Sequence, residues 1–188
     1  ASDPSWIRSM NSLLAECDLV AGKSQEALSR LTPFLDQHGW RRDVGFLGTL
    51  AHVLTELDRV EEAREHAALG VKRAIEQGRQ DGLVEALVIE GAVATLQGVF
   101  LEAERLLNDA LNHARDIPFP YGEARALVEL ARCNVAGENV ADATTHLRQA
   151  ASIFAALGAM PDRRIAEALL TTIDHRSDGE GGENDRTS

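Results

Sequence analysis

The sequence has few aromatic residues, few prolines and few β-branched residues. Aromatic side chains make up 4% of the 188 residues, and proline occurs 5 times. Alanine and leucine are abundant instead, with 28 and 24 copies. These two residues favour helices, whereas sheets are rich in aromatic and β-branched side chains. The composition therefore predicts an all-α protein and disfavours a β-sandwich or barrel.

Positive charge is also scarce. The chain has 19 Lys and Arg against 30 Asp and Glu, a net charge of −11. Binding to a phosphate backbone needs a basic surface, so we expect no direct nucleic-acid binding by this domain. The longest apolar stretches, such as 82–89, are shorter than the roughly 20 residues that span a bilayer, and no charged-then-apolar leader opens the chain. We therefore expect no membrane contact and a cytoplasmic location.

Cysteine and histidine are too scattered to predict a metal site. Cys17 and Cys133 each lie inside an apolar helical pattern, which favours reduced, unpaired thiols. No histidine forms a close ligand pair with another histidine or a cysteine. The sequence also has no glycine-rich phosphate loop and no Gly-x-Ser-x-Gly elbow. We therefore expect no metal, no cofactor and no enzymatic activity.

Four segments of the chain repeat one pattern, a turn followed by a small alanine. These marker alanines are spaced by 36, 40 and 40 residues. Four and seven residues after each marker stand further small or apolar residues, which together form one stripe along a helix. The markers are Ala27, Ala63, Ala103 and Ala143, and the stripe adds Leu31, Phe34, Ala67, Gly70, Leu107, Ala110, Leu147 and Ala150.

A second helix precedes each turn, and it carries a pair of residues at a fixed place before the marker. The second member of every pair is small, which allows two antiparallel helices to approach closely. Each repeat is therefore predicted to be a helix-turn-helix unit. The pairs are Leu14-Ala15, Leu50-Ala51, Glu90-Gly91 and Leu130-Ala131.

This pattern resembles the tetratricopeptide repeat (TPR), in which such a pair, a turn residue and three spaced small or apolar residues recur. The similarity spans about residues 8–157 and is weakest in the first unit. It implies an all-α, TPR-like right-handed superhelix, an α-solenoid whose first helices line the concave side. We expect one domain over 1–174, with units near 5–40, 43–79, 82–117 and 121–158 and a cap helix at 162–174.

Proline marks several of the expected boundaries. Pro118 and Pro120 separate the third and fourth units, whereas Pro33 falls inside a helix and should kink or split it. From His175 onward no apolar residue is available for burial, so 175–188 is predicted to be a disordered acidic tail. The expected helices lie near 5–21, 24–38, 43–57, 60–77, 82–97, 100–116, 121–136, 139–157 and 162–174.

A narrower similarity covers about residues 80–170. The blocks that begin Pro120-Tyr-Gly-Glu-Ala-Arg-Ala-Leu and His146-Leu-Arg-Gln-Ala-Ala resemble the helical-repeat region of large LuxR-type and maltose-regulator-type bacterial transcriptional regulators. Those proteins combine such repeats with an ATPase module and a DNA-binding domain. The resemblance implies a fragment of a multidomain regulator. Nothing in this sequence supplies a phosphate loop or a recognition helix, so neither of those activities is assigned to the chain.

The concave groove is the expected binding surface, because the first helices would line it. Peptide-clamping TPR proteins grip a carboxylate with Lys and Asn, but the matching positions here hold Ser12, Gly48, Val88 and Val128, so we expect no such clamp. The candidate groove residues lie opposite the buried pair on each first helix. They are Ser12, Glu16, Leu19, His52, Thr55, Val88, Glu90, Ala92, Thr95, Arg125, Val128 and Arg132.

Two features of this set have more than one interpretation. Arg125 and Arg132 either bind an acidic segment of a partner or are solvated and bonded to neighbours such as Glu129. Glu90 takes a column that holds leucine in the other units. Either a slight rotation of the helix or an arginine of the next unit, such as Arg125 or Arg132, compensates for the buried carboxylate, or Glu90 faces a pocket.

The sequence thus favours a non-catalytic scaffold for protein or peptide partners or for self-association. The alternative is a sensor that binds a small molecule or short peptide in the groove. A third hypothesis is that apolar residues predicted to be exposed bind a helix or tail of a neighbouring chain. Those residues are Leu19, Val20, Val88 and Leu96.

Overall fold

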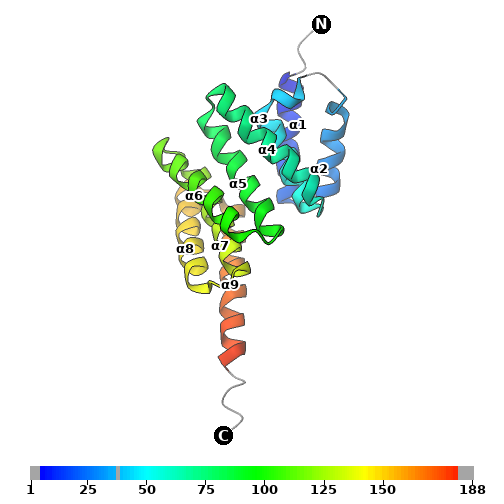
Figure 1. Ribbon diagram of the computed structural model, residues 1–188. Coiled ribbons are helices and arrows are strands. Elements are labelled where there is room, and N and C mark those ends of the chain that lie inside the picture. Colours follow the sequence, from blue (N-terminus) through cyan, green and yellow to red (C-terminus); the bar gives the residue numbers. More distant parts are fainter. Residues whose placement is uncertain (1–4, 37–38, 182–188) are drawn as a thin grey trace.

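The structure, a computed structural model, describes residues 5–36 and 39–181, and within them every regular element is a helix. This confirms the all-α prediction. Figure 1 shows the helices stacked in chain order, with α1 and α9 at opposite ends of the stack. The α-helices are α1 (Ser5–Val20), α2 (Ser24–Leu31), α3 (Val44–Glu56), α4 (Val60–Gln77), α5 (Gln80–Leu96), α6 (Phe100–Asp116), α7 (Pro120–Ala136), α8 (Val140–Leu157) and α9 (Met160–Gly181).

Pro33 ends the second helix early, as the sequence predicts. Helix α2 stops at Leu31 and continues as a 3-10 turn, Thr32–Phe34, that contains the proline. Proline has no N–H for the helical hydrogen bond, so the chain tightens and then leaves the helix. The predicted end of this helix, at residue 38, lies outside the described residues.

Consecutive helices pack as hairpins, and each hairpin stacks on the next. Helices α1 and α2, α3 and α4, α5 and α6, and α7 and α8 form the four hairpins, and α9 follows α8 in the same stacking order. The four marker alanines are fully buried. A Cβ added to Gly91 would lie 2.5 Å from Cγ of Leu107, so α5 and α6 approach so closely that only glycine fits there.

Two predictions about the ends of the array are wrong. Leu14 is 41% exposed, whereas its counterparts Leu50 and Leu130 are buried, because no helix among the described residues packs over α1 on that side. Helix α9 continues to Gly181, so residues 175–181 are helical rather than disordered. Extending an existing helix adds one hydrogen bond per residue, and no proline follows Pro161 to stop it. The rest of the predicted tail, 182–188, lies outside the described residues.

An ion pair joins the first two hairpins. Arg8 Nε donates to Asp43 Oδ2 at 2.9 Å, and the Arg8 side chain is only 7% exposed. The other oxygen of Asp43 accepts a hydrogen bond from the Phe46 N–H and so caps the start of α3. One carboxylate therefore both starts α3 and neutralises a buried arginine of α1.

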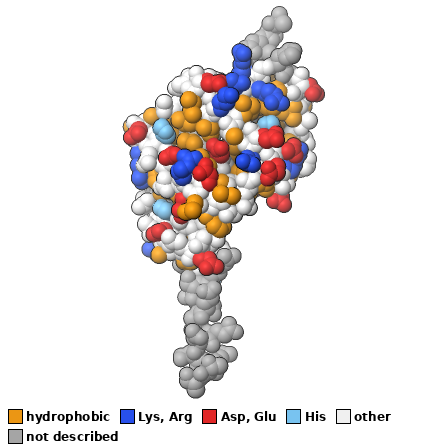
Figure 2. Space-filling model, in the orientation of Figure 1, with side chains coloured by type: hydrophobic (Ala, Val, Ile, Leu, Met, Phe, Trp, Pro, Cys, Tyr) orange, Lys and Arg blue, Asp and Glu red, His pale blue; other side chains and the backbone are white. Residues whose placement is uncertain are grey.

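Charges of both signs are mixed on the surface. Several arginines pair with a carboxylate three residues away, as Arg59 does with Glu62 and Arg105 with Glu102. Figure 2 shows acidic and basic side chains next to each other, with hydrophobic side chains exposed between them. Within the described part of the chain, no helix combines the length and the apolar character needed to cross a bilayer.

Gly91→Ala tests the close approach of α5 and α6. We expect it to lower the free energy of unfolding by roughly 1–3 kcal/mol, because the methyl group overlaps the buried Leu107 side chain. Gly45→Ala is the matched control, since a Cβ there has only ordinary contact, 3.7 Å from Asp43 Oδ1. The control should be neutral or slightly stabilising in urea unfolding. Equal effects of the two substitutions would contradict the packing argument.

Candidate functional site

A hollow of about 480 Å³ opens on the side lined by the first helices of the repeat units. Three predicted groove residues, Ser12, Glu16 and Arg125, line it. The hollow spans the first to the fourth unit, which shows that the solenoid curves enough for α1 and α7 to share one site. The remaining lining residues are Ser9, Leu13, Asp43, Gly45, Phe46, Gly48, Thr49, Arg79, Glu85, Ile89 and Tyr121.

A smaller hollow of about 100 Å³ adjoins the larger one, and Arg125 lines both. Three more predicted groove residues lie here, namely His52, Val128 and Arg132. The other lining residues come from α7, α8 and α9: Glu129, Phe154, Asp162 and Ile165. The two hollows together form the concave groove of this protein.

Arg125 is the cation at the centre of the groove. Its charge is balanced by Glu16, Glu85 and Glu129, which lie on three different helices. None of the ion pairs or hydrogen bonds between described side chains includes its guanidinium group. A guanidinium offers five donors in a fork that fits a carboxylate. Arg125 therefore presents donors to the groove that no described residue engages directly.

Glu16 and His52 connect the first unit to the second. Glu16 Oε2 lies 3.5 Å from His52 Nδ1, and this buried nitrogen has no hydrogen-bond partner among the described residues. Burial raises the pKa of Glu16, but His52, Arg125 and Thr49 together more than offset this and hold the pKa below its ordinary value. Glu16 is therefore an anion in the groove at neutral pH.

Glu85 and Tyr121 are partly buried residues that line the larger hollow. Burial raises the pKa of Glu85, and nearby Glu16 adds to the effect while Arg125 opposes it. Burial also raises the pKa of Tyr121, whose hydroxyl donates to Asp162 Oδ1 at 3.2 Å. This last contact ties α7 to the start of α9 at the groove.

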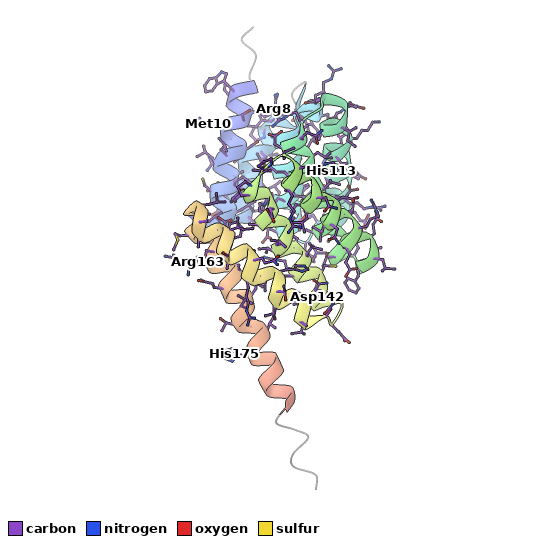
Figure 3. The ribbon with its side chains drawn as sticks, turned by 90° about the vertical axis from the view of Figure 1, so that its left-hand side faces the viewer. Arg8, Met10, His113, Asp142, Arg163 and His175 are labelled. Atoms are coloured by element: carbon purple, nitrogen blue, oxygen red, sulfur yellow. The ribbon has the colours of Figure 1, made fainter. Side chains whose placement is uncertain are left out.

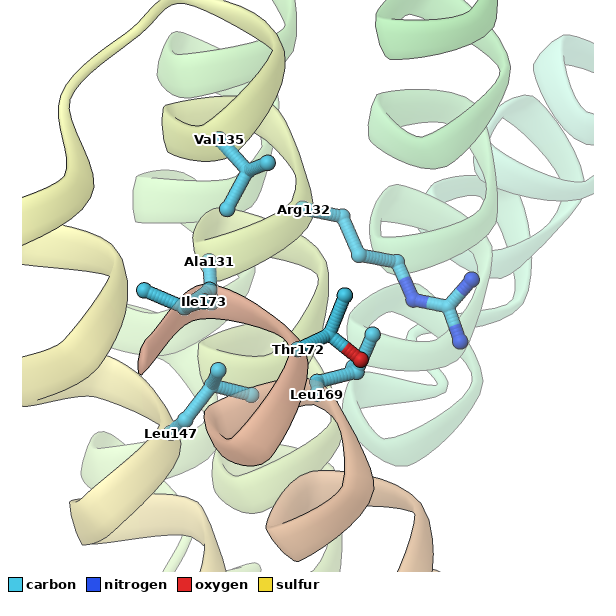
Figure 4. Close-up of a pocket in the computed structure, with 7 residues that line it drawn as sticks. All are labelled: Ala131, Arg132, Val135, Leu147, Leu169, Thr172 and Ile173. Atoms are coloured by element: carbon cyan, nitrogen blue, oxygen red, sulfur yellow. The ribbon is translucent and has the colours of Figure 1, made fainter. Parts of the chain in front are cut away.

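A separate pocket of about 180 Å³ lies between α7, α8 and α9 and is mostly apolar. Arg132 borders both this pocket and the smaller hollow. Figure 4 shows its guanidinium extending away from the apolar side chains of Leu147 and Ile173. Arg132 Nε lies 3.6 Å from Glu129 Oε1, so part of the arginine's charge is compensated within the protein. This agrees with the interpretation in which Arg132 pairs with Glu129.

Besides Glu90, five of the predicted groove residues line neither hollow. Leu19 packs against the core beside α2, and Val88 is only 2% exposed, so neither is the exposed apolar site that was expected. The hydroxyls of Thr55 and Thr95 bond to carbonyls one turn earlier in their own helices. Ala92 is partly buried. A helix face is wider than the stripe that lines the hollows, so residues at its edges do not reach them.

Glu90 lies away from the groove. The charges that act on it are Glu102 and Arg105 of α6 and Arg64 of α4, so neither Arg125 nor Arg132 compensates it. Its position in the leucine column leaves it partly buried, and burial, together with Glu102, raises its pKa. Glu90 therefore affects how α4, α5 and α6 pack against one another.

Several groove residues were missed, and counting along the chain by the repeat spacing would have found one of them, Ile165. Ser9, Gly45, Glu85 and Arg125 occupy one column of the first helices, and a further step of 40 residues from Arg125 reaches Ile165. Helix α9 was interpreted as a cap, so its contribution to the groove was not predicted.

The carboxylates and histidine of the groove do not form a metal site among the described residues. Among the described residues, no three side chains of His, Cys, Asp and Glu come together in a way that would hold one. The groove contains Glu16, His52 and Glu85, but these belong to ion pairs and charge interactions with protein groups.

No protein-family model matches the chain, and no curated protein sequence is significantly similar to it. Solved structures do share its fold. A Rap protein complexed with competence and sporulation factor superposes with a TM-score of 0.75 at 17% identity, covering 94% of this chain and 51% of that one. This chain therefore spans about half the length of that Rap protein.

Two further structures share this fold. A Podosopora anserina putative kinesin light chain with nearly identical TPR-like repeats gives a TM-score of 0.62 at 20% identity, covering 97% of this chain and 92% of that one. BtubC (BKLC) from P. vanneervenii gives 0.53 at 16% identity, covering 90% and 80%. At these identities the likeness establishes the fold, and the chain is an all-α, TPR-like α-solenoid.

Glu90→Leu tests the structural role of this residue. Because the folded state raises the pKa of Glu90, it binds the proton more tightly than the unfolded state does. The carboxyl group therefore lowers stability as pH rises above its ordinary pKa of 4.5. We expect the leucine to raise the free energy of unfolding at pH 7 by roughly 0.5–2 kcal/mol, with a smaller gain at acidic pH.

The control is Glu65→Leu, because Glu65 is an exposed carboxylate on α4. It should change stability little at either pH in the same urea unfolding series. A loss of stability in Glu90→Leu, or a gain that does not depend on pH, would contradict this interpretation of Glu90.

Proposed function

We propose that this domain is a protein-interaction scaffold that binds an extended, acidic segment of a partner in its concave groove. The observation that carries this proposal is Arg125, which lines two adjoining hollows and has guanidinium donors that no described residue engages directly. A carboxylate of the ligand would accept two parallel hydrogen bonds from this group. His52 and Arg132 add donors along the smaller hollow.

The groove also limits which ligands it accepts. Glu16 and Glu85 stand on the other side of Arg125 and would repel a second acidic group there. They favour a basic or amide group of the ligand in the larger hollow. The charge pattern therefore gives the bound segment a direction, with its acidic end towards α9.

The repeat architecture supports this function as well. Solenoids of stacked hairpins present long concave surfaces that suit extended ligands. The structurally similar Rap protein was solved as a complex with competence and sporulation factor. We further propose that the domain belongs to a multidomain bacterial transcriptional regulator, on the strength of the sequence similarity over about residues 80–170.

Arg125→Gln tests the binding site directly. Displayed random peptides selected on the wild-type domain should be enriched in Asp and Glu, and their affinity for Arg125→Gln should fall about tenfold or more, since a charged hydrogen bond is lost. Arg64→Gln is the matched control, because that arginine is 63% exposed on α4 and lines neither hollow. Selected peptides without acidic residues, or equal binding to Arg125→Gln, would contradict the proposal.

A small-molecule sensor is the second candidate function, and the volume of the larger hollow favours it. About 480 Å³ lies within the range of known ligand pockets. Ile165 separates the two functions because it lines only the smaller hollow. Ile165→Asp should weaken a segment that crosses both hollows. It should leave unchanged the binding of a small molecule that occupies the larger hollow alone.

A further inference from the structure

Helix α1 carries a continuous apolar surface that faces solvent. Its exposed members include Trp6 at 65% and Met10 at 50%, and the thiol-bearing Cys17 lies between them and the end of the helix. Spacings of three, four and seven residues place these side chains on one side of the helix. We call this surface the α1 outer face, and it consists of Trp6, Ile7, Met10, Leu14 and Cys17.

Counting along the chain by the repeat spacing identifies the residues that occupy the same positions in the later units, and those residues are buried. Steps of 36, 76, 116 and 156 residues from Met10 reach four residues that are at most 2% exposed. The same steps from Cys17 reach four residues that are at most 5% exposed. The counterparts of Met10 are Phe46, Ala86, Ala126 and Ala166, and those of Cys17 are Val53, Val93, Cys133 and Ile173.

A helix covers this surface in the later units. Helix α4 packs on α5, α6 on α7 and α8 on α9. A Cβ added to Gly70 of α4 would lie 3.5 Å from Cβ of Ala86, the counterpart of Met10. In Figure 3 Arg8 points towards the neighbouring helices and Met10 points away from them. The α1 outer face is thus built like a helix-stacking surface that no described residue covers.

The opposite end of the solenoid does not match this surface. On α9, steps of 40 residues from Leu127 and Ala131, which are buried, reach Glu167 and Thr171, which are exposed. Head-to-tail stacking of copies would therefore place a carboxylate and a hydroxyl against apolar side chains, which is costly. Contact between two α1 outer faces buries apolar groups on both sides and closes after two copies.

Charge also favours this end of the molecule for self-contact. The chain carries a net charge of −11, so most approaches of two copies are repulsive. The α1 outer face contains no charged residue. We propose that the α1 outer face is a dimer interface that packs against the same face of a second copy of this chain.

The size of the interface sets its strength. Helix α1 has 16 residues and is therefore about 24 Å long, so contact between two such faces belongs to the small, transient class of interfaces, below about 1,200 Å². We expect a dissociation constant in the micromolar range, which means that the dimer forms and dissociates with protein concentration.

Sedimentation equilibrium of the full chain tests the proposal from about 1 µM to about 1 mM, a range that brackets a micromolar dissociation constant. The apparent mass should rise from 20.4 kDa towards twice that value. The emission of Trp6 should shift to shorter wavelength over the same range, while Trp40 is already buried. Met10→Glu should stay monomeric and show no shift, because two carboxylates would face each other in the interface.

Two control variants show whether dimerisation depends on this face alone. Leu101→Glu replaces an 85% exposed leucine on α6 and should dimerise like the wild type. Arg125→Gln should do the same, so loss of groove binding and loss of dimerisation are distinguishable. Trp6→Ser is a second interface variant, and thermal unfolding of the monomer reports whether either interface variant still folds.

The proposal is overturned if the wild type remains monomeric at the highest concentration, as it would if the face is covered only by a helix of another protein. It is also overturned if Met10→Glu and Trp6→Ser both dimerise with wild-type affinity, or if the mass continues to grow beyond a dimer.

Discussion

The close approach of the two helices in each hairpin is the constraint on which this structure depends. The marker alanines and the small residues opposite them are fully buried, and at Gly91 even one methyl group would overlap Leu107. This spacing fixes the angle between helices, and the angle repeats because the residues repeat. The curve that follows brings α1 and α7 to one groove, although more than 100 residues separate them in sequence.

The groove and the α1 outer face follow from the same geometry. First helices place one stripe towards the concave side and another towards the preceding helix. The concave stripe changes from unit to unit, as Ser9, Gly45, Glu85 and Arg125 show, because a ligand rather than a neighbour sets its chemistry. The columns of Met10 and Cys17, which face the preceding helix, stay small or apolar in every unit, since they are buried in all but the first.

Most of the fold was predictable because small residues at regular spacing define the repeat. The hairpins, the split at Pro33 and most helix boundaries follow from local spacing and from backbone constraints. The ends of the array were not predictable in the same way. Leu14 is apolar like its counterparts, but no described helix covers it. Residues 175–181 extend α9 because no proline interrupts the helix there.

The candidate site was predicted only in part. Choosing the residues opposite the buried pair on each first helix identified Glu16, His52, Arg125 and Arg132. This choice did not distinguish side chains that line the hollows from those, such as Val88, that are buried in the core. It also placed Glu90 in the groove, whereas its charged neighbours are Arg64, Glu102 and Arg105. Those distinctions depend on the rotation of each helix against its neighbours, which a single sequence pattern does not contain.

The central claim is that stacking brings the first and fourth units together at one charged groove. An NMR titration of the Glu16 side-chain carboxyl, in the wild type and in Arg125→Gln, measures this most directly. Arg125 lowers the pKa of Glu16 across the groove, so the account predicts that the pKa of Glu16 rises when the arginine is replaced. A Glu16 pKa that is the same in both proteins would contradict the account.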